Sequence, residues 1–228
     1  MAIPKLITRA GRRYTPDFDA ALLDAEKEAG GTWRRTQGGW NAGGVAASGG
    51  THDQDAVDYS VIGKTESEVA RLITALRKRG LFASFRTTKI PKWGVRAQGF
   101  GAYHVHVVGN LWGHQSSGAA YQAREYRAGR DGLRGKGPDK GGPGHTRDYT
   151  SVTWPGYLAA KKAAKSAVKY RVATRLLPLN GRTGPGTRYR KIATAKRGTV
   201  LAIVETKAGW AKDTGGRWWK LSYLKKKA

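Results

Sequence analysis

Two short segments about fifty residues apart hold three of the five histidines of this chain, and the fold has to bring them together if they act as one site. Residues 49–58 read Gly-Gly-Thr-His-Asp-Gln-Asp-Ala-Val-Asp and contain His52 and Asp58. The second segment, residues 103–106, reads Tyr-His-Val-His. Both adjoin β-prone runs. Residues two apart on a strand share a face, so we expect His104 and His106 to lie side by side.

A histidine and an aspartate from one segment, with a histidine from the other, have the composition of a catalytic zinc site, which uses three protein ligands and leaves a fourth position for water. His52 and Asp58 would lie on the order of 20 Å apart if the chain between them were extended, at ~3.3 Å per residue. Residues 53–55 must therefore turn the chain back. Taken singly, each histidine is better explained by a structural hydrogen-bonding role, and only the combination favours a metal site.

The 228 residues suffice for one large domain or two small ones. The chain has no cysteine, so its stability does not depend on disulfides. The first residues lack the apolar core of a signal peptide, and no apolar run of about eighteen residues occurs, so we expect neither export by the usual route nor membrane insertion.

The net charge of +26 indicates a polyanionic partner, and it is unevenly distributed. Residues 1–154 carry 23 Lys and Arg against 14 Asp and Glu, whereas residues 169–228 carry 16 against 2. Nucleic acid, anionic lipid and bacterial wall polymers all have the required charge.

Residues 1–154 alternate helical and strand patterns, which predicts an α+β domain with helices covering one face of a small sheet. Helices are expected at 17–30, after the capping box at 65–68, and within 116–129. Strands are expected at 56–62, 81–86 and 102–108. Residues 155–168 read as a linker that can be helical, and the short β-prone runs of 169–228 predict a small barrel.

The residues Gly-Gly-Thr-His52, Ala56-Val57-Asp58 and His104-Val-His106 together resemble the zinc peptidases that cleave D-Ala-D-Ala and other peptidoglycan bonds, relatives of lysostaphin-type enzymes and the hedgehog zinc domain. The resemblance covers residues 30–150, and residues 126–133 are similar to the tail of actinobacterial members. It implies that His52, Asp58 and His106 bind zinc, with His104 as base or transition-state stabiliser. Gln37 and Ser48 match positions that hold substrate.

This chain departs from the family pattern in one spacing. Five residues separate His52 from Asp58, where the family has six, so Asp55 is an alternative ligand if the turn is built differently. No counterpart of the glutamate base of some branches lies near His106.

Residues 179–189, with the turn Asn-x-Arg-x-Gly-Pro-Gly, and the terminal Tyr223-Leu224 are similar to bacterial SH3-like modules, which implies attachment to the cell wall. Four aromatic residues are candidates for stacking on wall groups or, equally, for core packing. These are Trp210, Trp218, Trp219 and Tyr223.

These resemblances imply a monomeric zinc peptidase that degrades peptidoglycan, most simply a bacteriophage endolysin released through a phage-made membrane lesion. A protein that binds nucleic acid or wall polymers without catalysis is the alternative, because so basic a chain binds DNA nonspecifically in any case. A wall-anchoring protein with an inactive site is the third hypothesis.

Overall fold

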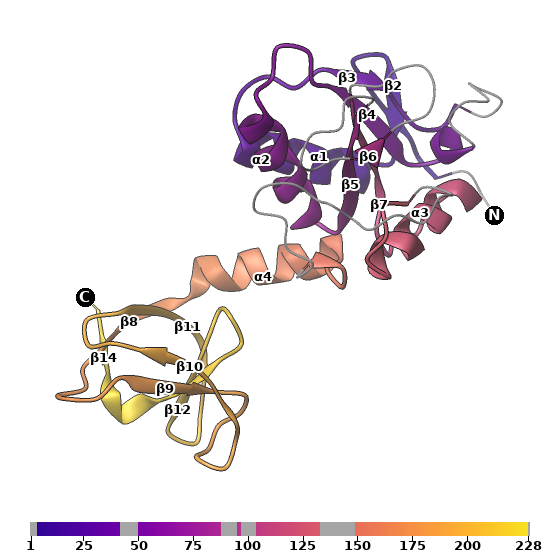
Figure 1. The fold of residues 1–228 in the computed structure, drawn as a ribbon. Coiled ribbons are helices and arrows are strands. Elements are labelled where there is room, and N and C mark those ends of the chain that lie inside the picture. The colour runs from indigo at the N-terminus through magenta and orange to yellow at the C-terminus, as the bar shows by residue number, and fades with distance from the viewer. Residues whose placement is uncertain (1–3, 42–49, 88–94, 97–103, 133–148, 228) are drawn as a thin grey trace. The chain divides into compact units, whose positions relative to one another are not determined.

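The computed structural model describes residues 4–41, 50–87, 95–96, 104–132 and 149–227 (Figure 1). The chain divides into two compact units, Met1–Tyr157 and Leu158–Ala228. The first unit mixes helices and strands and the second is built almost entirely from strands. The α+β class expected from the sequence is thus observed.

The first unit is built on a five-stranded sheet with the strand order β3-β4-β7-β5-β6. All neighbouring strands are antiparallel except β5 and β6, which are parallel. The strands are β3 (Arg35–Gln37), β4 (Ala56–Ser60), β5 (Leu81–Thr87), β6 (Val95–Arg96) and β7 (His104–Gly109). A separate hairpin of β1 (Ile7–Arg9) and β2 (Arg12–Tyr14) precedes them.

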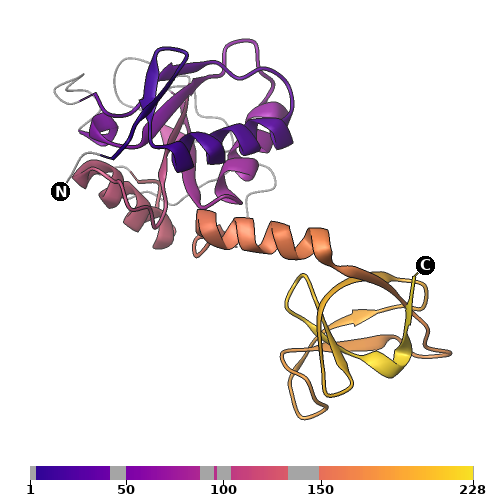
Figure 2. The same ribbon diagram turned by 180° about the vertical axis from the view of Figure 1, so that it is seen from behind.

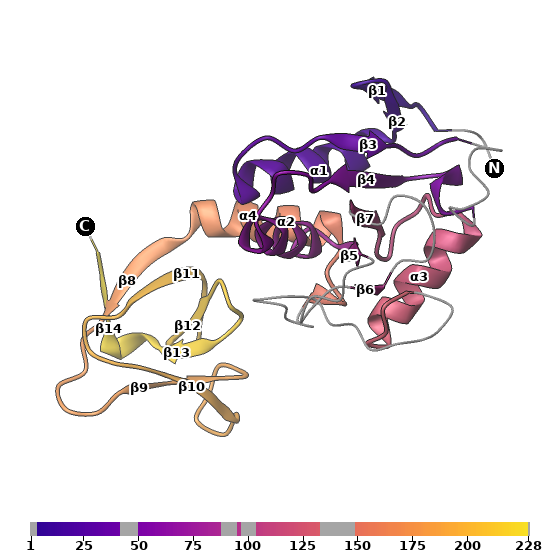
Figure 3. The same ribbon diagram turned by 45° about the horizontal axis from the view of Figure 1, so that its top comes forward.

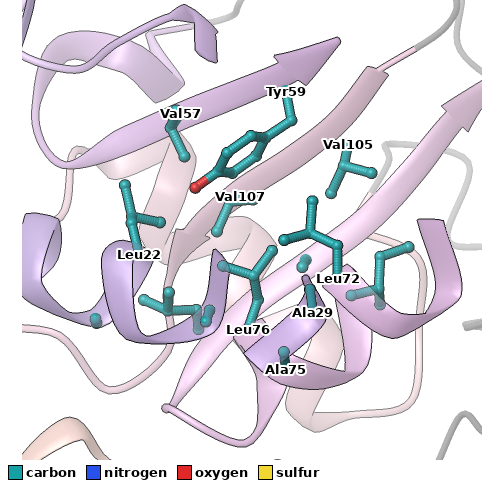
Figure 4. Packing of buried hydrophobic residues seen from close by; sticks show 14 of the residues in the cluster. Leu22, Ala29, Val57, Tyr59, Leu72, Ala75, Leu76, Val105 and Val107 are labelled. Atoms are coloured by element: carbon teal, nitrogen blue, oxygen red, sulfur yellow. The ribbon is translucent and has the colours of Figure 1, made fainter. Parts of the chain in front are cut away.

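Helices α1 (Pro16–Ala29) and α2 (Glu66–Arg77) cover one face of this sheet (Figures 2 and 4). Proline at the first position starts α1, and Gly30, with φ 72°, ends it. The predicted capping box starts α2, where Thr65 accepts from the Glu68 amide and Glu68 bonds back. Both helices pack leucine and alanine side chains on strand residues such as Val57 and Val107 (Figure 4).

Helix α3 (Ser117–Arg127) lies on the other face of the sheet, so the expectation that helices cover a single face is wrong (Figure 3). The strands carry apolar residues on this face too, at Ala56, Phe82 and Val108, and α3 buries them with Ala119 and Tyr126. Because both faces of the sheet carry apolar residues, helices have to cover both faces to remove these residues from water. The remainder of this face is polar and holds the histidines.

The fourth helix, α4 (Trp154–Ser166), occupies most of the segment expected to be a linker. Its first turn belongs to the first unit: Trp154 is buried in the α1/α2 core, and the Tyr157 hydroxyl donates to Asp24 Oδ2 at 2.7 Å. The rest of the helix is mostly exposed alanine and lysine.

The second unit contains one seven-stranded antiparallel sheet with the order β10-β9-β13-β12-β11-β8-β14. Its strands are β8 (Val168–Val172), β9 (Leu179–Arg182), β10 (Lys191–Ala195), β11 (Val200–Lys207), β12 (Trp210–Asp213), β13 (Trp218–Lys220) and β14 (Leu224–Lys226). Small apolar residues and Trp219 form its core. Asp213 organises the turn between β12 and β13 by accepting from the Gly215 and Arg217 amides and from the Trp219 indole.

Candidate metal centre

Strands β4 and β7 place the aspartate and both histidines of the pair on one face of the sheet. Asp58 lies directly opposite His106, and Ser60 lies opposite His104. Residues opposite each other on antiparallel strands share a face. The alternation that buries Val57, Val105 and Val107 against α1 and α2 therefore turns Asp58, His104 and His106 to the other side.

A 3₁₀ helix, Thr51–Asp53, brings His52 back to Asp58. It starts after Gly50 in the left-handed conformation, and the Trp40 amide donates to Gln54 O at 3.2 Å. Gly39 makes this contact possible, since a Cβ on Gly39 would overlap the Gln54 carbonyl. The sequence predicts a turn at residues 53–55. In the structure the turn is the 3₁₀ helix Thr51–Asp53, and Gln54 is already extended.

His52, Asp58 and His106 form one group whose potential ligand atoms all lie within 4.8 Å of one another. His106 Nδ1 is 2.8 Å from Asp58 Oδ1, and His52 Nε2 is 3.4 Å from Asp58 Oδ2. All three side chains are largely buried, with 13% of the Asp58 side chain exposed. These are the three residues expected to bind zinc.

Hydrogen bonds on the side of each ring that faces away from Asp58 show which ring nitrogen of His52 and His106 carries a proton. His52 Nδ1 lies 2.9 Å from Gly38 O and His106 Nε2 lies 2.8 Å from Gln122 Oε1. Both partners are acceptors, so each of these nitrogens carries a proton. The opposite nitrogen of each ring faces the Asp58 carboxylate.

The pKa values of Asp58 and His106 also favour a metal site. Burial alone would raise the pKa of Asp58, but the His106 and His52 imidazoles beside it hold that pKa well below its usual range. Burial lowers the pKa of His106 to about 4, in spite of the adjacent carboxylate. At neutral pH Asp58 is therefore a carboxylate beside a neutral His106 imidazole, the state in which these side chains bind a metal.

This donor set fits a zinc ion. Two imidazole nitrogens and a carboxylate oxygen lie within 4.8 Å of one another, close enough to share one ion. Zinc accepts nitrogen and oxygen ligands of this kind, and three of them leave one coordination position open. Gly38 O and Gln122 Oε1 supply the acceptors that usually orient metal-bound histidines.

His104 lies beside the group and is its more exposed histidine. Its Nε2 is 3.8 Å from Asp58 Oδ1, its ring centroid is 6.3 Å from that of His106, and 20% of its side chain is exposed. His104 is therefore more open to solvent than His52 and His106, whose side chains are 4% and 7% exposed.

Asp55, the alternative ligand, points away from the group. Its Oδ1 accepts from the Thr15 amide and the Trp40 indole, both at 2.9 Å, while its Oδ2 accepts from the Thr15 hydroxyl and, at 3.3 Å, from the Trp112 indole. Burial raises its pKa, against the lowering effect of these donors. Asp55 anchors the segment before β4, and Asp58 is the carboxylate at the site.

Of the two residues expected to hold substrate, Gln37 lies within the described part of the chain and Ser48 does not. Gln37, at the end of β3, lies directly opposite Asp58 and is half-buried. It therefore adjoins the metal group. Ser48 lies outside the described residues.

Gln122 is a site residue that sequence reasoning missed. It comes from α3, three residues after the buried Ala119 and four before the buried Tyr126. A polar residue within the inward stripe of an amphipathic helix was the available signal. Ser84 and Arg86 of β5, which share the site face, were missed because their strand was assigned only a packing role.

Of the four aromatic residues considered for wall binding, Trp219 packs in the core of the second unit and is 1% exposed. Trp218 is 7% exposed, and Lys212 Nζ lies 5.6 Å from the centre of its ring. Trp210 is 6% exposed but lines a pocket of 480 Å³ together with Tyr223, which is 50% exposed. Of these four aromatic residues, Tyr223 and Trp210 are therefore the two that line a pocket.

Comparison of the chain with protein-family models, with curated proteins and with solved structures finds no match. No helix in the described part of the chain has the length and apolar character needed to cross a membrane.

Proposed function

We propose that the chain is a zinc-dependent peptidase of bacterial peptidoglycan, a wall-lytic enzyme of the endolysin kind. One observation carries the proposal: potential ligand atoms of His52, His106 and the buried Asp58 lie within 4.8 Å of one another, an arrangement that suits a metal ion. The His104-Val-His106 and Gly-Thr-His52 sequences, by resemblance, specify which chemistry that cation serves.

In this proposal each residue has one task. His52 Nε2, a carboxylate oxygen of Asp58 and His106 Nδ1 hold the zinc, and Gly38 O and Gln122 fix the two rings. When bound, zinc supplies a Lewis acid and lowers the pKa of its water to about 7. His104 transfers a proton from the attacking water to the amine that leaves, and Gln37 contacts the substrate backbone.

The second unit would be an SH3-like module that retains the enzyme on the wall. Support comes from its short antiparallel strands, from the excess of 16 basic over 2 acidic residues in 169–228, and from the pocket beside Tyr223. Positive charge attracts anionic wall polymers over a distance, and an exposed tyrosine ring stacks on sugar or peptide groups.

The proposal is tested on a suspension of bacterial cell walls. The full chain should lower the turbidity of the suspension, a chelator should abolish this activity, and added zinc should restore it. His104→Ala should keep zinc but lose at least about 100-fold in rate, the usual contribution of a general acid or base. Lysis that the chelator does not affect would contradict a zinc mechanism.

His114→Ala provides the matched control, because His114 is a histidine of the same unit outside the metal group. Its ring lies 6.0 Å from that of Trp40, and its replacement should leave the rate of lysis close to that of the parent chain. If the parent chain binds walls tightly but never releases soluble peptides, the non-catalytic polyanion-binding alternative is favoured.

A further inference from the structure

Leu176 and Leu177 lie in the segment that joins β8 to β9, and most of their surface faces water. Leu176 is 95% exposed and Leu177 is 78% exposed. Apolar residues scattered singly over a surface are ordinary, as at Ile62, but two adjacent leucines with this exposure form one apolar patch. Contact with water makes such a patch unfavourable, and a partner that covers it removes that cost.

The same two leucines line the pocket of 480 Å³ that Trp210 and Tyr223 also line. Half of Tyr223 is exposed, so its ring lies between the pocket and water. Aromatic side chains with a polar end are favoured at such boundaries, where one part of the ring is apolar and the other is hydrated. The apolar patch therefore continues into a hollow that an aliphatic group can enter.

The charge around this patch is positive. Among the described residues that line the pocket, Arg175, Arg182 and Lys220 are basic and none is acidic. The two acidic residues of 169–228 lie elsewhere, each in an ion pair with another basic residue. The patch therefore calls for a partner that combines hydrocarbon with negative charge.

We propose that this surface attaches the second unit to an anionic lipid membrane, with Leu176 and Leu177 among the acyl chains and Arg175 and Lys220 near the lipid phosphates. Protein surfaces that lie on membranes combine apolar side chains at the acyl boundary, aromatic rings at the headgroups and basic residues that attract anionic lipid. Wall polymers match the charge but offer no hydrocarbon to the leucines. The contact is peripheral, and it goes beyond the peptidase function without depending on it.

Co-sedimentation with lipid vesicles tests the leucines at constant charge. The full chain should bind vesicles of phosphatidylglycerol and phosphatidylcholine, and Leu176→Ser/Leu177→Ser should bind them at least about 10-fold more weakly, because both leucines lose their transfer from water. Val200→Ser/Val204→Ser is the matched control, since both valines are exposed in the same unit and neither lines the pocket. The control should bind as the parent chain does.

The basic residues are tested by a second pair of variants. Arg175→Gln/Lys220→Gln should weaken binding to the anionic vesicles about 10-fold and reduce its dependence on salt, because basic side chains near an anionic bilayer each contribute attraction. Lys162→Gln/Lys165→Gln removes the same charge from exposed positions of α4 and should have a smaller effect. Vesicles of phosphatidylcholine alone should bind the parent chain weakly.

A fluorescent label reports whether the patch enters the bilayer. The chain has no cysteine, so a single introduced cysteine takes the label at one position. A nitrobenzoxadiazole label on Leu177→Cys should shift to shorter wavelength with anionic vesicles, and nitroxides in the acyl region should quench it. The same label on Val200→Cys should show neither effect.

Three outcomes overturn the proposal. The first is equal vesicle binding by the parent chain and Leu176→Ser/Leu177→Ser, which leaves the net charge of +26 as the whole attraction. The second is a label at position 177 that stays in water while the chain is bound. The third is a double serine variant that loses binding to cell walls but not to vesicles, which assigns the surface to a wall polymer. Absence of wall lysis by the parent chain would contradict the peptidase function alone.

Discussion

At the scale of single residues, Gly38 and Gln122 decide which nitrogen of each imidazole faces Asp58. Their oxygens lie 2.9 and 2.8 Å from the outer nitrogens of His52 and His106. A histidine whose outer N–H is held in this way presents a fixed lone pair and a fixed ring orientation. Two residues outside the candidate ligand set thus fix the orientation of both rings.

Replacement of Gln122 tests this positioning role. Gln122→Leu removes the acceptor for His106 Nε2–H, so we expect zinc affinity to fall about 10- to 100-fold, as for other outer-shell partners of metal ligands. Gln122→Glu keeps an acceptor and should retain affinity close to that of the parent chain. Competition with a chromogenic chelator measures both values. Equal affinity of the parent chain and Gln122→Leu would contradict the role assigned to the glutamine.

At the scale of the elements, Asp213 allows the second unit to be perturbed separately. It is 3% exposed and accepts from two turn amides, the Trp219 indole and Arg217 Nε. Asp213→Ala should lower the free energy of unfolding of this unit by about 2–4 kcal/mol, since several buried donors lose their charged acceptor. Calorimetric melting measures the change.

Glu205→Ala is the control for that variant. Glu205 is exposed and pairs with Lys212 at 3.5 Å, an interaction worth about 0–1 kcal/mol. The Asp213→Ala chain should also keep its zinc, because the metal group lies wholly in the first unit. Loss of zinc in this variant would contradict the separation of the two functions.

The elements that local patterns encode were predictable from the sequence. The capping box of α2, the glycine end of α1 and the alternation of β4, β5 and β7 each gave an element close to its observed bounds. Short strands whose pairing is decided by partners distant in sequence were not predicted, as for β3 and β6. The cover of the second sheet face by α3 was missed for the same reason.

The candidate site was predictable in its ligands but not in its surroundings. His52, Asp58 and His106 have a recognisable spacing, whereas Gln122 joins them only through the packing of α3 on the sheet. The choice between Asp58 and Asp55 also needed the structure, because it depends on where Trp40, Trp112 and Thr15 place their donors.

At the scale of the whole molecule, the two units differ in charge and in chemistry. The metal group and its supporting residues lie in Met1–Tyr157, while the last sixty residues carry more than half of the net charge of +26. Such a division suits an enzyme that is held at a polyanionic surface by one unit and acts through the other. We propose that the first unit binds zinc through His52, Asp58 and His106.

Metal analysis of the purified full chain tests that claim most directly. After exposure to zinc and removal of the excess, the parent chain should hold about one zinc ion, as a three-ligand catalytic site does. His52→Ala and Asp58→Asn should hold almost none, while His114→Ala and Asp55→Asn keep it. A parent chain without zinc, or an Asp58→Asn chain that binds it as well as the parent, would contradict the account.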